Sequence, residues 1–216
     1  MKIGILGGSF NPIHNGHIKL ALSALSEYSL DNVLIMPNND TYYKQDAAIS
    51  DEDRIEMIRL AIRGIEGLEL SDMEIKRGGI TYTIDTIREL KAYDASQGKE
   101  NEYYFIIGGD SLEHLYYWRE IGELFKNMVF LAAVRDDINH DKMEELRHMY
   151  VEHYPEARIE FLSVDAENIS SSDIRRKASK GLSISDLVSP EVEEYIVGNK
   201  LYFIQEGQSD GKKRNA

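Results

Sequence analysis

The sequence contains no cysteine, only four prolines and a single tryptophan among its 216 residues. Without cysteine the chain forms no disulfide, no cysteine-ligated zinc site and no thiol nucleophile. Long apolar runs are missing too, since the longest, Met128 to Val134, is far too short to cross a bilayer. The chain opens with a strand-like run, Lys2 to Leu6, and shows no secretory signal pattern. We therefore expect a cytoplasmic protein with no membrane segment.

Positive charge is also scarce, because 25 Lys and Arg stand against 38 Asp and Glu and leave a net charge of -13. Nucleic acids attract clustered Lys and Arg, so neither DNA nor RNA is expected as a partner. A small nucleotide is not excluded, because a local site can be positive on an acidic protein. Hydrophobic residues make up 42% of the chain, which is enough for the core of one domain.

Short continuous apolar runs alternate with stretches of helical apolar spacing. Continuous runs are typical of strands buried on both faces, and the alternation implies βαβ units. The runs that predict strands are Ile3–Leu6, Val33–Met36, Leu68–Leu70, Tyr103–Ile107, Met128–Ala133 and Ile159–Leu162. The helical stripes are Ile18, Ala21, Leu22 and Leu25; Ile55, Ile58, Ile62 and Ile65 behind a capping box of Ser50 with Asp53; Ile84, Ile87 and Leu90; and Met143, Leu146 and Tyr150. The predicted fold is α/β, a Rossmann-like, doubly wound parallel sheet.

The last third of the chain predicts helices only, with candidates at Ser170–Ser179 and Pro190–Val197. We expect a single domain over residues 1–204, in which about 165–204 form a small C-terminal helical part. Residues 205–216 are polar and lack any apolar period, which predicts a disordered tail.

The segment after the first strand, from Gly7 to His17, reads Gly-Gly-Ser-Phe-Asn-Pro-Ile-His-Asn-Gly-His. In an open parallel sheet, ligands bind beyond the carboxyl ends of the strands, and two glycines let the backbone approach a ligand closely. With Asn15 as the expected N-cap, His17 lies in the first helical turn, where free N–H groups and the helix dipole attract anions. The spacing matches neither a Walker A loop nor a GxGxxG fingerprint. Two other interpretations of His14 and His17 stay open, a metal-binding pair and ordinary surface histidines.

A second segment, Ile169 to Arg175, reads Ile-Ser-Ser-Ser-Asp-Ile-Arg and predicts a turn into a helix. Serines cap helices for ordinary reasons, which is one interpretation. The other is a second phosphate site, because hydroxyls gather at a helix start with Arg175 one turn further on.

The two segments resemble the signature motifs of the HxGH nucleotidyltransferase superfamily. The stretch GGSFNPIHNGH carries the namesake His14-Asn15-Gly16-His17, and ISSSDIR is similar to the ISSSxIR motif. The resemblance implies that His14, His17 and Arg175 are catalytic. It also implies an ATP site of Gly7, Gly8, Ser9, Phe10, Gly16, Gly108, Asp110, Ile169, Ser171 and Ser172, in which the last two hold the β- and γ-phosphates and Asp110 holds a ribose hydroxyl.

Further segments narrow the resemblance to the bacterial nicotinate-mononucleotide adenylyltransferases, over Met1 to about Tyr202. They are Ile106–Leu112, Tyr82–Thr86, Trp118 and Leu187–Tyr202. The resemblance implies transfer of AMP from ATP to nicotinate mononucleotide, a step of NAD biosynthesis that yields deamido-NAD and pyrophosphate. It implies an acceptor site of Lys44, Tyr82, Thr83 and Trp118. Structural interpretations remain: Trp118 as core, Thr83 as a helix cap, and Asp110 as a turn residue.

One segment departs from the family pattern. Where the family usually has Pro-Pro-His-Lys, this chain has Thr41-Tyr42-Tyr43-Lys44, so only the lysine matches. Lys44 can still meet an acceptor phosphate as a point charge.

The expected cofactor is Mg²⁺ that binds with ATP and is held mainly by substrate and water, so no protein metal site is expected. The expected partners are ATP and nicotinate mononucleotide, with a homo-oligomer as a further possibility because edges of such sheets pair. Alternatives are an enzyme of the same fold with another acceptor (nicotinamide mononucleotide or phosphopantetheine), a non-catalytic nucleotide sensor, and a metal-binding protein.

Overall fold

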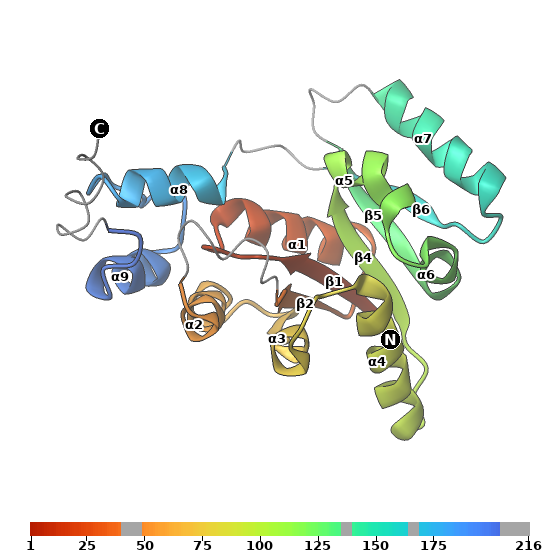
Figure 1. Ribbon diagram of the computed structural model, residues 1–216, viewed down its shortest axis with the longest axis horizontal. Helices are drawn as coiled ribbons and strands as arrows, with labels where there is room; N and C mark the ends of the chain where they lie inside the picture. Colours follow the sequence, from red (N-terminus) through yellow and green to blue (C-terminus); the bar gives the residue numbers. More distant parts are fainter. Residues whose placement is uncertain (40–48, 135–139, 164–168, 204–216) are drawn as a thin grey trace, which may run out of the picture.

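The computed structural model describes residues 1–39, 49–134, 140–163 and 169–203. Its strands form one parallel sheet in the order β3-β2-β1-β4-β5-β6 (Figure 1). They are β1 (Lys2–Gly8), β2 (Asn32–Pro37), β3 (Leu68–Leu70), β4 (Glu102–Gly108), β5 (Met128–Val134) and β6 (Ile159–Ser163). The six predicted strands are confirmed. Five of them extend beyond the predicted ends by one or two residues, such as Gly7 and Glu102, which carry no apolar signal.

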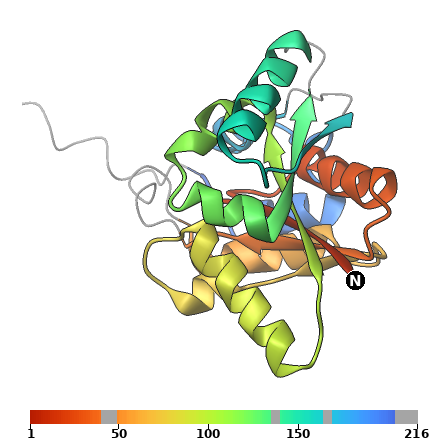
Figure 2. The ribbon, with the colours of Figure 1, turned by 90° about the vertical axis from the view of Figure 1, so that its right-hand side faces the viewer.

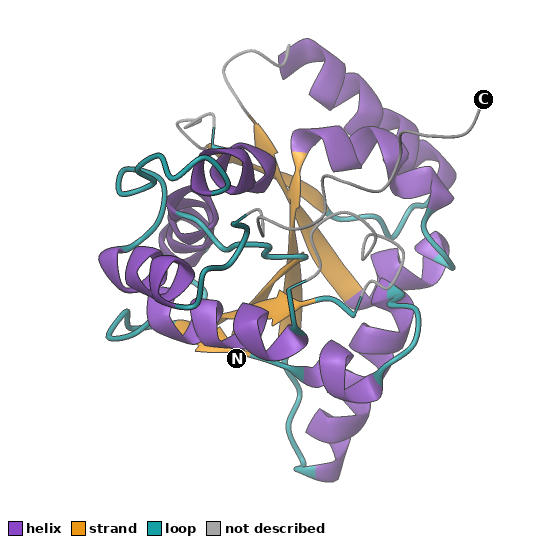
Figure 3. Ribbon diagram, turned by 60° about the vertical axis from the view of Figure 1, so that its left-hand side comes forward, coloured by secondary structure: helices purple, strands orange, loops and turns teal. Residues whose placement is uncertain are grey.

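Helices cover both faces of the sheet (Figures 2 and 3). One face packs against α1 (Asn15–Glu27), α2 (Asp51–Ala61), α8 (Ser171–Ala178) and α9 (Pro190–Gly198). The other packs against α4 (Thr83–Ser96), α5 (Gly109–His114), the 3-10 helix η1 (Leu115–Tyr117), α6 (Ile121–Asn127) and α7 (His140–His153), with the short α3 (Met73–Arg77) beside β2. The α/β fold with a doubly wound, Rossmann-like sheet is therefore confirmed.

The strands send alternate side chains into two separate apolar clusters. In β5, Val129 and Leu131 pack under α1 and α8, while Phe130 and Ala132 pack under α6. Because both faces are covered, every position of the strand is apolar, and this is why the runs in the sequence are continuous.

The capping box of Ser50 with Asp53 is confirmed at the start of α2. The predicted stripe on α2 is wrong in part, because α2 ends at Ala61, before Ile62 and Ile65, and Ile55 belongs to neither apolar cluster. In the first predicted stripe, Leu22 on α1 is exposed. The small side chains of Ala21 and Ala24 face the sheet instead and are fully buried. Small residues let α1 approach the strands closely, and this contact turns Leu22 outward.

The strand order places the first half of the chain on one side of β1 and the second half on the other, beginning with β4. The connections leaving β1 and β4 therefore diverge, and a crevice opens beyond the carboxyl ends of these two strands. The helices α8 and α9 pack in the same apolar cluster as α1 and α2. The domain limit at residue 204 and the expected tail lie outside the described residues.

No helix within the described ranges is both long enough and apolar enough to traverse a lipid bilayer.

Candidate active site

The segment between β1 and α1 turns sharply and places two histidines side by side. Phe10 adopts a φ of 45°, in the left-handed region, and its side chain is buried. The predicted N-cap, Asn15, is wrong by one residue: Asn15 is the first residue of α1, and the extended His14 precedes the helix as its N-cap. The backbone N–H of His14 donates to Nδ1 of His17 over 3.2 Å, whereas that of Asn15 donates to the carbonyl of Leu187 over 2.9 Å. His17 still lies in the first turn, as predicted.

The rings of His14 and His17 stack with their centroids 3.6 Å apart, and Phe10 packs edge-on against His17 at 4.9 Å. Burial lowers the pKa of His17 to about 3, and the neighbouring His14 acts in the same direction. His17 is therefore neutral at pH 7. Because its Nδ1 accepts the His14 N–H, its proton resides on Nε2, which leaves Nε2–H as a hydrogen-bond donor.

The second motif meets the first, across 159 and 164 positions of sequence. The hydroxyl of Ser171 donates to the carbonyl of Pro12 over 2.9 Å, and the guanidinium of Arg175 donates to the carbonyl of Asn11 over 2.8 Å. The hydroxyl of Tyr202 donates to the side-chain oxygen of Asn11 over 2.7 Å. These bonds tie the turn before α1 to the C-terminal helices.

Gly16 allows the two motifs to approach closely. A Cβ atom at this position would lie 3.1 Å from Nδ1 of His14 and 3.8 Å from Cβ of Ile169. A Cβ atom here would therefore force the His14 ring to shift by a few tenths of an ångström. At the start of α8, the N-cap is Ser170, whose oxygen accepts the N–H of Asp173 over 3.1 Å.

Arg54 is a functional candidate that sequence analysis missed. Its side chain is buried and donates to the carbonyls of Ser9 (2.7 Å) and Asn38 (2.8 Å), which follow β1 and β2, and to the carboxylate of Asp51 (2.7 Å). The available signal was a charged residue four positions before Ile58, on the buried face of α2. A buried cation thus holds together the loops that follow β1 and β2.

A cavity of about 640 Å³ occupies the crevice at the carboxyl ends of β1 and β4. At one end lie the glycines of both strands and the His17 ring, and at the other end lie the aromatic side chains around the start of α4. The predicted site residues that line it are Gly7, Gly8, His17, Tyr82, Thr83, Gly108 and Trp118. Residues from four separate segments of the sequence therefore share one cavity.

Trp118 packs against the core and also lines the cavity. Its ring packs edge-on against Phe105 at 5.7 Å and Phe130 at 6.0 Å, and it also lines the cavity. At the start of α4, Tyr82 occupies the N-cap position and Thr83 the first helical position, so Thr83 is not the cap.

Other predicted residues lie outside the cavity lining. Asp110 is exposed and helical, in the first turn of α5, rather than part of a loop turn as one interpretation had it. It does not line the cavity. Arg175 and Ser171 contact the Asn11–Pro12 turn, and Ser172 lies at the exposed surface of α8 with its oxygen 3.2 Å from that of Ser170. Lys44 and the Thr41–Tyr43 departure lie outside the described residues.

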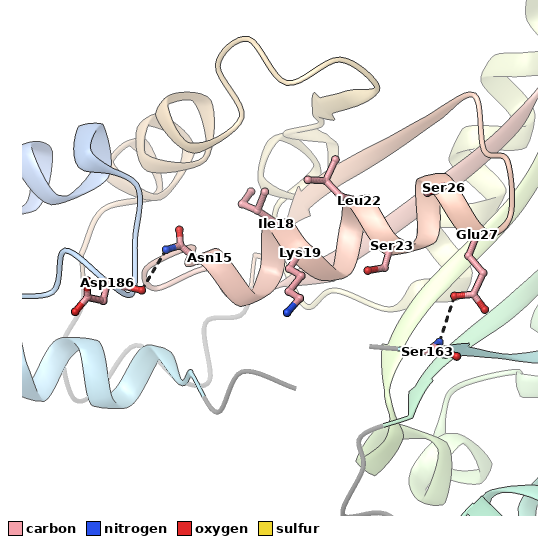
Figure 4. A pocket seen from close by; sticks show the side chains of 9 residues that line it. All are labelled: Asn15, Ile18, Lys19, Leu22, Ser23, Ser26, Glu27, Ser163 and Asp186. Atoms are coloured by element: carbon pink, nitrogen blue, oxygen red, sulfur yellow. Dashed lines mark hydrogen bonds between the residues drawn. The ribbon is translucent and has the colours of Figure 1, made fainter. Parts of the chain in front are cut away.

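A second, larger cavity of about 740 Å³ lies along the outer side of α1 (Figure 4). Its described lining includes none of the predicted site residues, and it is more open to solvent. Its polar groups already pair across it: Asn15 donates to the carbonyl of Asp186 over 3.3 Å, and the N–H of Ser163 donates to Glu27 over 3.3 Å. Of the two cavities, it is the smaller one in which glycine-rich strand ends and the His17 imidazole converge.

Comparisons with known proteins found related sequences and structures of similar fold. The cytidylyltransferase-like family matches residues 5–177. The chain is 40% identical to the probable nicotinate-nucleotide adenylyltransferase of Synechococcus sp. (strain JA-3-3Ab), over 93% of this chain and 94% of that protein. The fold is similar to nicotinic acid mononucleotide adenylyltransferase of Plasmodium falciparum, solved in complex with APC (TM-score 0.73, 96% of that chain) and with NaAD (TM-score 0.72, 97%). Both share 20% identity over 93% of this chain.

Proposed function

The chain belongs to the cytidylyltransferase-like family and, within it, to the nicotinate-nucleotide adenylyltransferases; we propose that its reaction takes place in the cavity at the ends of β1 and β4. It is an enzyme that transfers AMP from ATP to nicotinate mononucleotide, a step of NAD biosynthesis. The products are deamido-NAD and pyrophosphate.

The observation that carries the site assignment is the continuity of this one cavity. Its inner end offers glycine backbone and the Nε2–H donor of His17, which suit phosphate oxygens. Its outer end offers the flat walls of Tyr82 and Trp118, which suit an aromatic ring. A mononucleotide with a pyridine ring carries both groups in one molecule.

The proposed reaction needs no general base, because the acceptor's phosphate oxygen is already an anion near pH 7. This oxygen forms a bond to the α-phosphorus of ATP, and the bond from the α-phosphorus to the bridging oxygen breaks. That oxygen leaves with pyrophosphate. Catalysis then consists of positioning the two phosphates and stabilising the charge that moves between them.

In this proposal His14 and His17 contact the α- and β-phosphates, and the neutral state of His17 makes it a donor rather than a cation. The backbone of Ser9 holds the acceptor phosphate near the α-phosphorus. The leaving pyrophosphate is held by Ser171, Ser172 and Arg175, for which Ser171 and Arg175 would exchange their present backbone acceptors for phosphate oxygens. Asp110 binds a ribose hydroxyl. The acceptor is bound by Lys44, Tyr82, Thr83 and Trp118.

We also propose that Mg²⁺ accompanies ATP. In the described parts of the chain, no three His, Asp or Glu side chains converge as a metal-binding group. Mg²⁺ commonly keeps several waters and binds substrate phosphates, and this mode suits such a site. When bound it would neutralise phosphate charge.

The test is an acceptor panel. Purified protein receives ATP and Mg²⁺ with nicotinate mononucleotide, nicotinamide mononucleotide or phosphopantetheine, and dinucleotide products are measured by mass spectrometry alongside released pyrophosphate. We expect deamido-NAD as the preferred product. Preference for another acceptor would refute the substrate assignment. ATP binding without turnover of any acceptor would favour a nucleotide sensor.

A further inference from the structure

The cavity contains one cationic side chain that none of the proposed roles uses. Among the described residues that line it, Arg119 is the only lysine or arginine. Arg119 follows Trp118 directly and lies at the aromatic end, away from the strand-end glycines. A charge at this end faces the ring of the acceptor rather than its phosphate.

The position of Arg119 is set by its neighbours. Its guanidinium carbon lies 4.8 Å from the ring centroid of Tyr82, a cation–π contact between the end of η1 and the start of α4. The elements on either side pack together, since α4 and α6 lie side by side (Figure 1). The contact holds the guanidinium over the Tyr82 ring, at the wall of the cavity that Trp118 also lines.

The nearest carboxylate already has a closer partner. Glu120 accepts two hydrogen bonds from Arg88, at 2.6 and 3.2 Å, whereas Nε of Arg119 lies 3.8 Å from it. No hydrogen bond within the described residues engages the Arg119 guanidinium. Its planar set of donors is therefore available to a ligand.

The one acidic side chain on the described wall of the cavity is Glu74. It is buried, and its carboxylate accepts a hydrogen bond from the Thr86 hydroxyl over 2.6 Å. Burial raises its pKa, although the Thr86 bond and Arg77 oppose that rise. Glu74 is thus committed to the protein, and among the described lining residues Arg119 is the charged side chain that remains available to the ring end of an acceptor.

We propose that Arg119 is a specificity-determining residue, which favours an acceptor whose pyridine ring carries a carboxylate over one whose ring carries a carboxamide. This inference rests on the proposed function of the cavity. A guanidinium binds a carboxylate with two parallel charge-assisted hydrogen bonds, whereas a neutral carboxamide offers one acceptor oxygen and no charge. Because the Arg119 side chain is 55% exposed, solvent screens the pair, and the preference is moderate.

The test compares the two acceptors in Arg119→Met, with kcat and KM measured separately. We expect the KM for nicotinate mononucleotide to rise about tenfold, the scale of one partly exposed charge pair. The KM for nicotinamide mononucleotide and both kcat values should stay within about twofold, because Arg119 is remote from the reacting phosphate. Arg119→Lys keeps the positive charge but lacks the two parallel donors of the guanidinium, and it should recover part of the loss in affinity.

A matched control is Arg158→Met. Arg158 is 49% exposed and pairs with Glu102 over 2.7 Å, at the amino ends of the strands and so at the opposite end of the sheet from the cavity. The Arg158→Met substitution removes the same charge and should leave the KM values for nicotinate mononucleotide and nicotinamide mononucleotide unchanged.

The outcomes separate the two proposals. If the native enzyme fails to use nicotinate mononucleotide, the proposed function is wrong. If it uses this acceptor but Arg119→Met changes the two KM values equally, or changes neither, Arg119 has no role in selection and the inference is overturned.

Discussion

The two ends of the cavity are built in opposite ways: the inner end beside His17, here called the phosphate end, and the outer end beside Tyr82 and Trp118, called the acceptor end. At the phosphate end, Arg54 of α2 and Arg175 of α8 donate to backbone carbonyls of the turn before α1, and the Tyr202 hydroxyl donates to the Asn11 side chain of the same turn. At the acceptor end, the walls are side chains near the surface, and Tyr117 is 82% exposed. The reaction centre thus depends on the fold as a whole. The acceptor end can change its selectivity by a single substitution without rebuilding the core.

The largest expected effect is on stability, from Arg54→Met. The change strips a buried cation from two backbone carbonyls and from Asp51, and it should lower the free energy of unfolding by about 3 kcal/mol. Urea unfolding measures the loss. Arg59→Met on the same helix is the control, because Arg59 is exposed and its ion-pair partner among the described residues is Glu56, so its cost should stay below about 0.5 kcal/mol. Equal urea midpoints for the two variants would show that Arg54 contributes no more to stability than the exposed Arg59, and that the phosphate end does not depend on its buried contacts.

The next effect is on turnover, from His17→Ala. The loss of one preorganised donor should reduce kcat by about 10²-fold or more. Steady-state rates with both substrates saturating give the value, and circular dichroism checks the fold. His148→Ala removes an exposed histidine of α7, on the other face of the sheet, and should leave kcat unchanged. A His17→Ala enzyme with near-native turnover would show that the imidazole is not part of the chemistry.

The burial of His17 also predicts a dependence of stability on pH. The pKa of its imidazole is about 3 in the folded protein and 6.5 for an unperturbed histidine, so below pH 6.5 the unfolded chain takes up a proton that the folded chain refuses. Stability therefore falls as the pH is lowered through this window, by about 2 kcal/mol between pH 6.5 and pH 5. Unfolding of His17→Gln across this range should show a shallower slope than the native protein. Parallel slopes would mean that His17 is not held neutral by the fold.

The smallest expected effect is on acceptor binding, from Trp118→Ala. The loss of one aromatic wall should raise the KM for the acceptor about tenfold and leave the KM for ATP within about twofold. Tyr93→Ala, which removes an exposed aromatic ring from α4 away from the cavity, serves as the control. Equal changes in both KM values would indicate that Trp118 acts through the packing of Phe105 and Phe130 rather than through the acceptor.

Much of the fold could be predicted because its signals are local. A strand covered on both faces needs apolar residues at every position, and this continuous pattern located all six strands to within two residues. Arg54 and Arg119 could not be found in this way. A single arginine on a helix or before one has the same sequence pattern whether it is solvated, as Arg59 is, or buried among carbonyls.

The sequence by itself determined the fold class, the family and the two motifs, since each is written in residues that are neighbours along the chain. Only the tertiary structure decided that Ser171 and Arg175 contact Pro12 and Asn11, and that one cavity joins His17 to Trp118. It also decided the neutral state of His17, because a pKa depends on the burial and charge that surround a group in space. The neighbours Phe10 and His14 are close in the sequence, but the burial that lowers the pKa of His17 most exists only once the chain has folded.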